Sequence, residues 1–184
     1  MLNCSYYMVE GKFDKIILNK IGIYKVEDGN GKENVIRQFR IASNGCFLVD
    51  GNDEGFNGIA NRFVNLNASS NPPIISIENR KLIVVGDPEN GYKGSMESIL
   101  LKMIKINEEN NVITQFLQKV SLTNAQRDKV LTNAQRDKVS LIMATFLRTQ
   151  DYQIFFSIDR FASRVVEFLG SDKIKKKLEE LRII

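Results

Sequence analysis

A tandem duplication constrains the second half of this chain more than any other feature of its sequence. The nine residues LTNAQRDKV occur twice without a gap, at positions 122–139. In each copy a threonine is followed three residues later by a glutamine, which is the capping-box spacing of a helix start. Because a helix turns about 100° per residue, a second copy rotates the chain by a net half turn. We expect one continuous helix, in which the two copies point their apolar residues to opposite sides.

The sequence leaves two interpretations of the duplication open. It is either a tolerated extension of a helix or a surface for self-association, because one core cannot cover both sides of such a helix. The apolar residues that would form this surface are Leu122, Val130, Leu131 and Val139. A break before Thr132, which would give two short capped helices, is the competing local structure.

The composition is that of an ordinary soluble globular protein. The 184 residues are 43% hydrophobic and 26% charged, and no apolar run has the length of a membrane span. Histidine is absent, which excludes Ser-His-Asp and Cys-His catalysis and histidine-containing zinc sites.

Cys4 and Cys46 lack metal-ligand spacing, and no signal peptide precedes them. We therefore expect reduced thiols in a cytoplasmic protein, and the abundance of Ile, Asn and Lys suggests an AT-rich bacterial or phage gene.

Positive charge is concentrated in the second half of the chain. Residues 93–184 contain 16 Lys and Arg against 11 Asp and Glu, whereas residues 1–92 contain 10 against 11. A basic helical half is a candidate for contact with an anionic partner such as the phosphates of a nucleic acid, although such stripes are also typical of solvated helix faces. The candidate anion-binding residues are Arg127, Lys129, Arg136, Lys138, Lys175, Lys176 and Lys177.

The order of the expected elements predicts an α+β fold. Residues 1–92 contain β-rich runs and turn signals, which we expect to form an N-terminal antiparallel β-meander. Expected strands cover residues 13–26 and 34–43, with a hairpin turn at Asn44-Gly45 and a second hairpin around Asn79. Residues 93–184 form the C-terminal helical half, which covers one face of the sheet within one continuous globular unit. A separate helical subdomain is the alternative.

Several stretches of the second half have helical spacing of their apolar residues. The segment 152–169 is the most amphipathic of them, and 140–148 is apolar nearly all round and should be buried. Gly170 is the expected stop before a last helix that is capped by Ser171. The other expected helices cover residues 95–106 and 112–120.

An acidic loop after the run CFLV is a candidate metal site. It resembles the start of a calcium loop, with oxygen ligands at alternate positions and Gly55 at the sixth, but Asn61 stands where a bidentate glutamate is required. An acidic surface loop without a metal is the alternative. The residues that would hold a divalent cation are Asp50, Asn52, Asp53 and Asp87.

Residues 86–95 lie between an expected strand and an expected helix, as a phosphate-binding loop does. However, Tyr92 and Gly94 interrupt the spacing G-x-x-x-x-G-K-[ST], and Asp87 and Glu89 within the segment would direct negative charge at a phosphate. We interpret this segment as a β-to-α turn.

These observations favour a non-enzymatic interaction or assembly protein that binds itself or another protein through its C-terminal helices. The pattern predicts no catalytic residues, no cofactor and no membrane span. Two other functions stay open. One is nucleic-acid binding by the basic helical half, and the other is metal-assisted hydrolysis by Asp50, Asp53 and Asp87.

Overall fold

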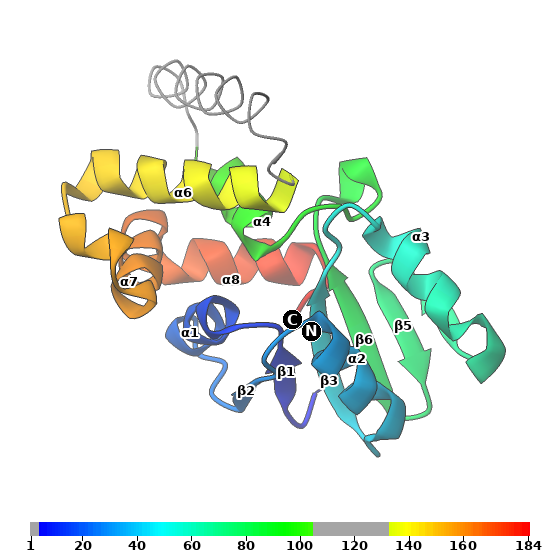
Figure 1. The fold of residues 1–184 in the computed structure, drawn as a ribbon. Coiled ribbons are helices and arrows are strands. Elements are labelled where there is room, and N and C mark those ends of the chain that lie inside the picture. Colours follow the sequence, from blue (N-terminus) through cyan, green and yellow to red (C-terminus); the bar gives the residue numbers. More distant parts are fainter. Residues whose placement is uncertain (1–3, 105–132) are drawn as a thin grey trace.

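The structure of the protein is a computed structural model that describes residues 4–104 and 133–184 (Figure 1). Its centre is a sheet of six strands in the order β2-β1-β3-β6-β5-β4. The first four strands in this order are parallel to one another, and β5 and β4 continue the sheet in antiparallel fashion. The strands are β1 (Tyr7–Val9), β2 (Val26–Asp28), β3 (Gly45–Asp50), β4 (Ser69–Asn71), β5 (Ile74–Ile77) and β6 (Arg80–Val85).

Helices cover both faces of the sheet, so two hydrophobic cores are formed (Figure 1). One face carries α1 (Lys12–Lys20), α4 (Met96–Met103), α6 (Asn133–Thr149), α7 (Ile158–Leu169) and α8 (Ser171–Glu180). The other carries α2 (Lys32–Ile41), α3 (Gly55–Ala60) and the 3₁₀ helix η1 (Asn61–Leu66). Two further 3₁₀ helices are η2 (Pro88–Asn90) and η3 (Tyr152–Phe155).

Strand β3 shows why the sheet is covered on both sides. Cys46 and Leu48 pack into the core beside α1, while Phe47 and Val49 pack into the core beside α2. Because neighbouring residues of a strand point to opposite faces, a strand buried on both faces reads as a continuous apolar run. The run CFLV is therefore typical of a central parallel strand.

The predicted division into an N-terminal sheet half and a C-terminal helical half is confirmed. The predicted antiparallel meander is restricted to β4, β5 and β6, where the hairpin between β5 and β6 forms as expected. The expected strands at 13–26 and 34–43 are wrong, since helices α1 and α2 occupy most of these residues. In α1, Phe13, Ile17 and Leu18 are buried at helical spacing. Packing of this stripe outweighs the strand preference of its β-branched residues.

The expected hairpin at Asn44-Gly45 is also wrong, because these residues connect α2 to the parallel strand β3. Gly45 has a positive φ of 110°. A positive φ is also required in the type I′ turns that Asn-Gly favours. The local turn signal was therefore genuine, but the element before it is a helix.

In the described part of the helical half the amphipathic pattern is confirmed, but the helix expected at 152–169 begins only at Ile158, since Tyr152–Phe155 form the separate η3. Helix α7 buries its apolar side, and Gly170 ends it with a φ of 86°. Ser171 is the first residue of α8 rather than its cap, which is Gly170. Ile174 and Leu178 bury the inner side of α8, and Leu141 lies fully buried in α6. The expected helix at 112–120, the first repeat copy and the join between the copies lie outside the described residues.

The prediction of two free thiols is wrong, because Cys4 and Cys46 form a disulfide. It joins the segment before β1 to β3, two neighbouring strands of the sheet. The sequence could not show this pairing, since the two residues are 42 positions apart and meet only through the strand order.

Among the described helices, none combines the length and the apolar character that crossing a membrane would require.

Candidate functional site

Acidic residues mark the carboxyl ends of all four parallel strands. Glu10 follows β1, Asp28 ends β2, Asp50 ends β3, and Asp87 lies two residues beyond β6. Parallel strands present their carboxyl ends at the same edge of the sheet. The chain also reverses its winding here, because α1 and α2 leave β1 and β2 on opposite faces. In open parallel sheets the crevice at such a switch point is the usual place for a ligand.

Glu10 and Asp50 lie together at the ends of the neighbouring strands β1 and β3. The Oε1 atom of Glu10 accepts a hydrogen bond from the backbone N–H of Asp50 at 2.7 Å. The Oδ1 atom of Asp50 in turn accepts one from the backbone N–H of Met96 at 3.3 Å. Met96 is the first residue of α4, so this carboxylate lies at the positive end of a helix dipole. These contacts join the two strand ends to α4.

Two further carboxyl groups, on α1 and α4, face the same place. Asp14 is in the first turn of α1 and Glu97 in the first turn of α4, and they are only 9% and 7% exposed. Within residues 4–104 and 133–184, no hydrogen-bond donor contacts the Asp14 carboxylate. A buried carboxylate without a donor is costly to the fold unless it is neutralised. We call Glu10, Asp14, Asp50 and Glu97 the acidic cluster.

Burial and the repulsion of neighbouring carboxyl groups raise the pKa of Glu10, Asp14 and Asp50. Burial raises the pKa of Asp14 well above its ordinary value, and the negative charges of Glu97 and Glu10 raise it further. The pKa of Asp50 is also raised well above its ordinary value, by burial first and then by Asp14, Glu10 and Glu97. Burial raises the pKa of Glu10 too, although the Asp50 N–H and the charge of Lys32 oppose the change. Positive charge from Lys32 and Lys138 therefore opposes these pKa shifts without cancelling them.

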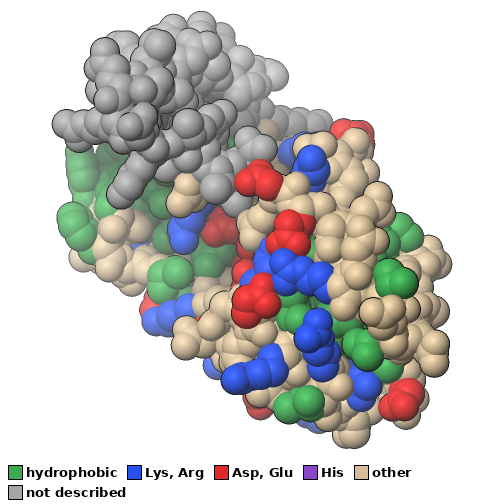
Figure 2. All heavy atoms as spheres, turned by 45° about the vertical axis from the view of Figure 1, so that its right-hand side comes forward, with side chains coloured by type: hydrophobic (Ala, Val, Ile, Leu, Met, Phe, Trp, Pro, Cys, Tyr) green, Lys and Arg blue, Asp and Glu red, His purple; other side chains and the backbone are tan. Residues whose placement is uncertain are grey.

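Two lysines border the acidic cluster. The Nζ atom of Lys138 lies 4.0 Å from Oε1 of Glu97, and its charge acts against the raised pKa of Asp14. The side chain of Lys32 is 12% exposed, and its Nζ atom lies 3.6 Å from Oε1 of Glu54, which is not a member of the cluster. On the face shown in Figure 2, acidic and basic side chains lie next to one another in a band across the molecule.

The loop after β6 closes against the end of β3 beside the cluster. The backbones of Asn52 and Gly94 exchange hydrogen bonds at 2.7 and 2.8 Å. At Gly51 the contact is so close that a Cβ atom would lie 1.7 Å from the carbonyl oxygen of Tyr92. Glycine is therefore required immediately after Asp50, and the loop fixes the position of the strand end. Residues 86–95 thus form the β-to-α turn that the sequence indicated.

The structure separates the residues that the sequence proposed as metal ligands. Asp50 belongs to the acidic cluster, whereas Asp53 is exposed and Asn52 is engaged through its backbone. Asp87 pairs with Lys102, with 2.6 Å between Oδ2 and Nζ. Three residues of the cluster were missed, namely Glu10, Asp14 and Glu97. Assigning YMVE and CFLVD as parallel strands would have placed Glu10 next to Asp50, but Asp14 and Glu97 required the helix positions.

The predicted interaction and anion-binding residues are only partly described. Leu122, Val130, Leu131, Arg127 and Lys129 lie outside the described residues, and the side chain of Arg136 is also outside the description. Val139 is half-buried on α6, and Lys138 faces Glu97. Lys175, Lys176 and Lys177 lie on α8.

Oxygen donors alone make up the cluster, which is the ligand type that Mg²⁺ and Ca²⁺ prefer. In the described part of the chain, no three acidic, cysteine or histidine side chains surround one point closely enough to hold an ion by themselves. This arrangement fits a cation that takes one or two carboxylates and completes its coordination with water and substrate oxygens, as Mg²⁺ commonly does.

Comparison of the chain with protein-family models, with curated proteins and with solved structures finds no match.

Proposed function

We propose that this protein is a metal-assisted hydrolase that acts on a phosphate ester, with Glu10 and Asp50 holding a divalent cation. The observation that carries the proposal is the gathering of four partly or fully buried carboxyl groups at the switch point of a parallel sheet. One of these groups, that of Asp14, has no hydrogen-bond donor among the described residues. A bound cation would balance the negative charge that Lys32 and Lys138 leave uncompensated.

The neighbouring groups suit phosphate chemistry. Mg²⁺ is usually held by one or two carboxylates together with the phosphate of its substrate. Such an ion would draw charge from the phosphate oxygens and acidify a coordinated water molecule. Lys32 and Lys138, which border the cluster, are positioned to attract an anionic substrate.

Asp14 is the candidate for proton transfer. Its pKa is raised well above the ordinary aspartate value, chiefly by burial. A carboxyl group with a raised pKa exchanges a proton closer to neutral pH, as a general acid or base must. Binding of a cation nearby would lower this pKa again, so the protonation state of Asp14 would depend on occupancy of the site.

An assay of phosphate-ester hydrolysis tests the proposal. The substrates are p-nitrophenyl phosphate and bis(p-nitrophenyl) phosphate, each with Mg²⁺ or Mn²⁺ and with a chelator. We expect cation-dependent release of nitrophenolate that falls by about 100-fold or more in Asp50→Asn and in Glu10→Gln, because each substitution removes a charged ligand. Asp53→Asn is the matched control and should keep full activity. Activity that persists unchanged in both ligand variants, or in the chelator, would contradict the proposal.

A second candidate function is self-association through the helical half, and exposed aromatic residues support it. Phe156 is 90% exposed, Tyr152 68% and Phe155 45%, and the last two rings pack against Phe146 of α6. Contiguous exposed apolar surface of this kind is typical of an interface. Light scattering after size-exclusion chromatography tests it. We expect a dimer or larger species that Phe156→Glu converts to a monomer, whereas a monomeric parent protein would remove this candidate.

A cytoplasmic location and nucleic-acid binding by the basic helices stay predictions from the sequence. Against the first stands the disulfide, which is a feature more typical of oxidising compartments. For the second, salt-sensitive binding to single- or double-stranded nucleic acid at low ionic strength is the expected result.

A further inference from the structure

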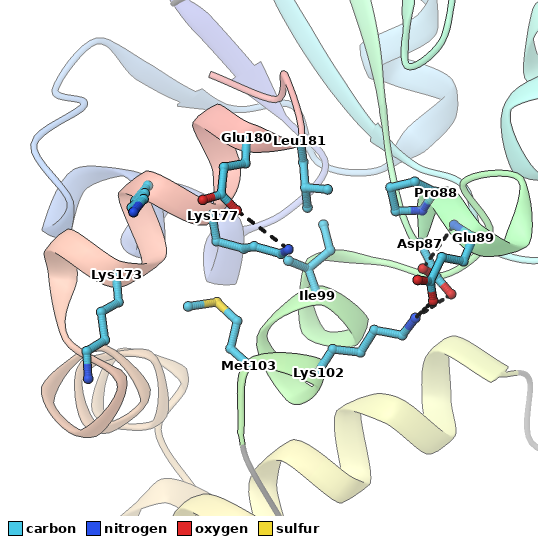
Figure 3. Close-up of a pocket in the computed structure, with 11 residues that line it drawn as sticks. Asp87, Pro88, Glu89, Ile99, Lys102, Met103, Lys173, Lys177, Glu180 and Leu181 are labelled. Carbon is cyan, nitrogen blue, oxygen red and sulfur yellow. Dashed lines mark hydrogen bonds and ion pairs between the residues drawn. The ribbon is translucent and has the colours of Figure 1, made fainter.

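A groove lies between α4 and α8 (Figure 3), and no residue of the acidic cluster lines it. Its volume is about 590 Å³, which is in the range of sites for small organic ligands. Ile99 and Met103 of α4 and Leu181, which follows α8, point into the space between the two helices, and Pro88 bounds it on the side of η2. The floor of the groove is therefore apolar.

Positive charge borders this apolar floor. Lys102 is already neutralised, because its Nζ atom lies 2.6 Å from Asp87 and 3.5 Å from Glu89. Lys177 pairs with Glu180 at 3.8 Å, as the dashed line in Figure 3 shows. Two further lysines of the lining, Lys173 and Lys176, have no acidic partner within the described residues.

The two unpaired lysines lie on the same side of α8. They are three residues apart, which places them on adjacent turns of one helix face. Both are exposed at the border of the groove, while the buried side of α8 packs Ile174 and Leu178 into the core. Lys173 and Lys176 both line the groove, so their positive charge borders the apolar floor on the side of α8.

We propose that this groove binds a small organic anion with an apolar body, such as an aromatic or branched aliphatic carboxylate, sulfonate or phosphate. The apolar body would cover Ile99, Met103 and Leu181, and the anionic group would pair with Lys173 and Lys176. Met103 suits such a floor because its unbranched side chain adapts to ligands of different shape. The lysine ammonium groups suit an anion that is held as a point charge rather than in a fixed geometry.

This inference does not depend on the proposed hydrolase. The groove and the acidic cluster use different residues of α4, with Glu97 in the cluster and Ile99, Lys102 and Met103 in the groove. A ligand bound in the groove needs no cation, so either proposal can fail without the other.

The probe for the test is 8-anilinonaphthalene-1-sulfonate, an aromatic anion that fluoresces in an apolar site. We expect saturable binding of about one equivalent that weakens at least 10-fold in Lys173→Glu/Lys176→Glu. The control Lys15→Glu/Lys20→Glu makes the same change in net charge on α1 and should bind as the parent protein does. Equal affinity in both double variants, or the absence of saturable binding, would overturn the proposal.

The methionine methyl groups locate the probe independently of these variants. In protein labelled at the methionine methyl carbons, we expect the Met103 resonance to shift on addition of the probe, with Met8 as an unaffected reference. Met8 packs against the core on the opposite face of the sheet. A titration that leaves the Met103 resonance unshifted would overturn the proposal even if fluorescence increases, because the probe would then lie elsewhere.

Discussion

Asp14 is a buried residue whose ionisation depends on the other charges of the acidic cluster. Its folded-state pKa is raised, first by burial and then by Glu97 and Glu10. Between the ordinary aspartate pKa and this raised value, the native state binds more protons than the unfolded state. The contribution of Asp14 to the free energy of unfolding is therefore complete below the ordinary pKa and is lost as the pH rises through the folded-state value.

Asp14→Asn should consequently stabilise the metal-free protein at neutral pH. The amide has a similar size and carries no charge. For each unit by which burial and repulsion raise the pKa of Asp14, removing the charge should add up to about 1.4 kcal/mol to the free energy of unfolding. We expect the melting temperature to rise by about 2–4 °C for each kcal/mol gained, and the gain to shrink at mildly acidic pH. Thermal unfolding in a chelating buffer measures both values, with Asp53→Asn as the exposed control. A lower melting temperature for Asp14→Asn at neutral pH would contradict the described environment of Asp14.

The disulfide is the element-scale feature with the largest expected effect on stability. It closes a loop between Cys4 and Cys46, which are 42 residues apart, and loops of this length are associated with a stabilisation of about 2–4 kcal/mol. A reductant should therefore lower the melting temperature of the parent protein by about 5–15 °C. In Cys4→Ser the melting temperature should not respond to the reductant. A parent protein that is equally indifferent would mean that the two cysteines are not paired.

Secondary structure was predictable where the local pattern was unambiguous. The amphipathic spacing of α7 and the β-branched runs on either side of Asn79 identified α7, β5 and β6 correctly. The spacing failed in α1, where β-branched residues and a stripe of only three buried apolar side chains allowed a strand to be expected instead. With α1 and α2 assigned as strands, the parallel sheet could not be recognised, because parallel pairing requires a crossover helix between strands.

The acidic site was predictable only in part, for the same reason. Asp50 was identified because it opens a stretch that resembles a calcium loop, and its partners were sought in that stretch and at Asp87. Glu10 lies 40 residues earlier and reaches Asp50 only through the pairing of β1 with β3. Asp14 and Glu97 depend on how α1 and α4 pack over the edge of the sheet. Local spacing contains no information on such contacts.

At the scale of the whole molecule, a net positive charge contrasts with the local negative charge of the acidic cluster. The chain has a net charge of +4, yet four carboxyl groups gather at one edge of its central sheet. The lysines of the chain thus do not fully balance the buried carboxyl groups of the cluster. This imbalance favours binding of a cation from solution. Binding of a cation to the native state alone would also stabilise the fold by mass action.

The most direct test of this account is a titration of the protein with Mn²⁺, followed by electron paramagnetic resonance of the free ion. We expect about one equivalent to bind, with affinity at least 10-fold lower in Asp50→Asn and in Glu10→Gln and unchanged in Asp53→Asn. Binding that is absent from the parent protein, or that survives both cluster substitutions and is lost in Asp53→Asn, would contradict the central claim.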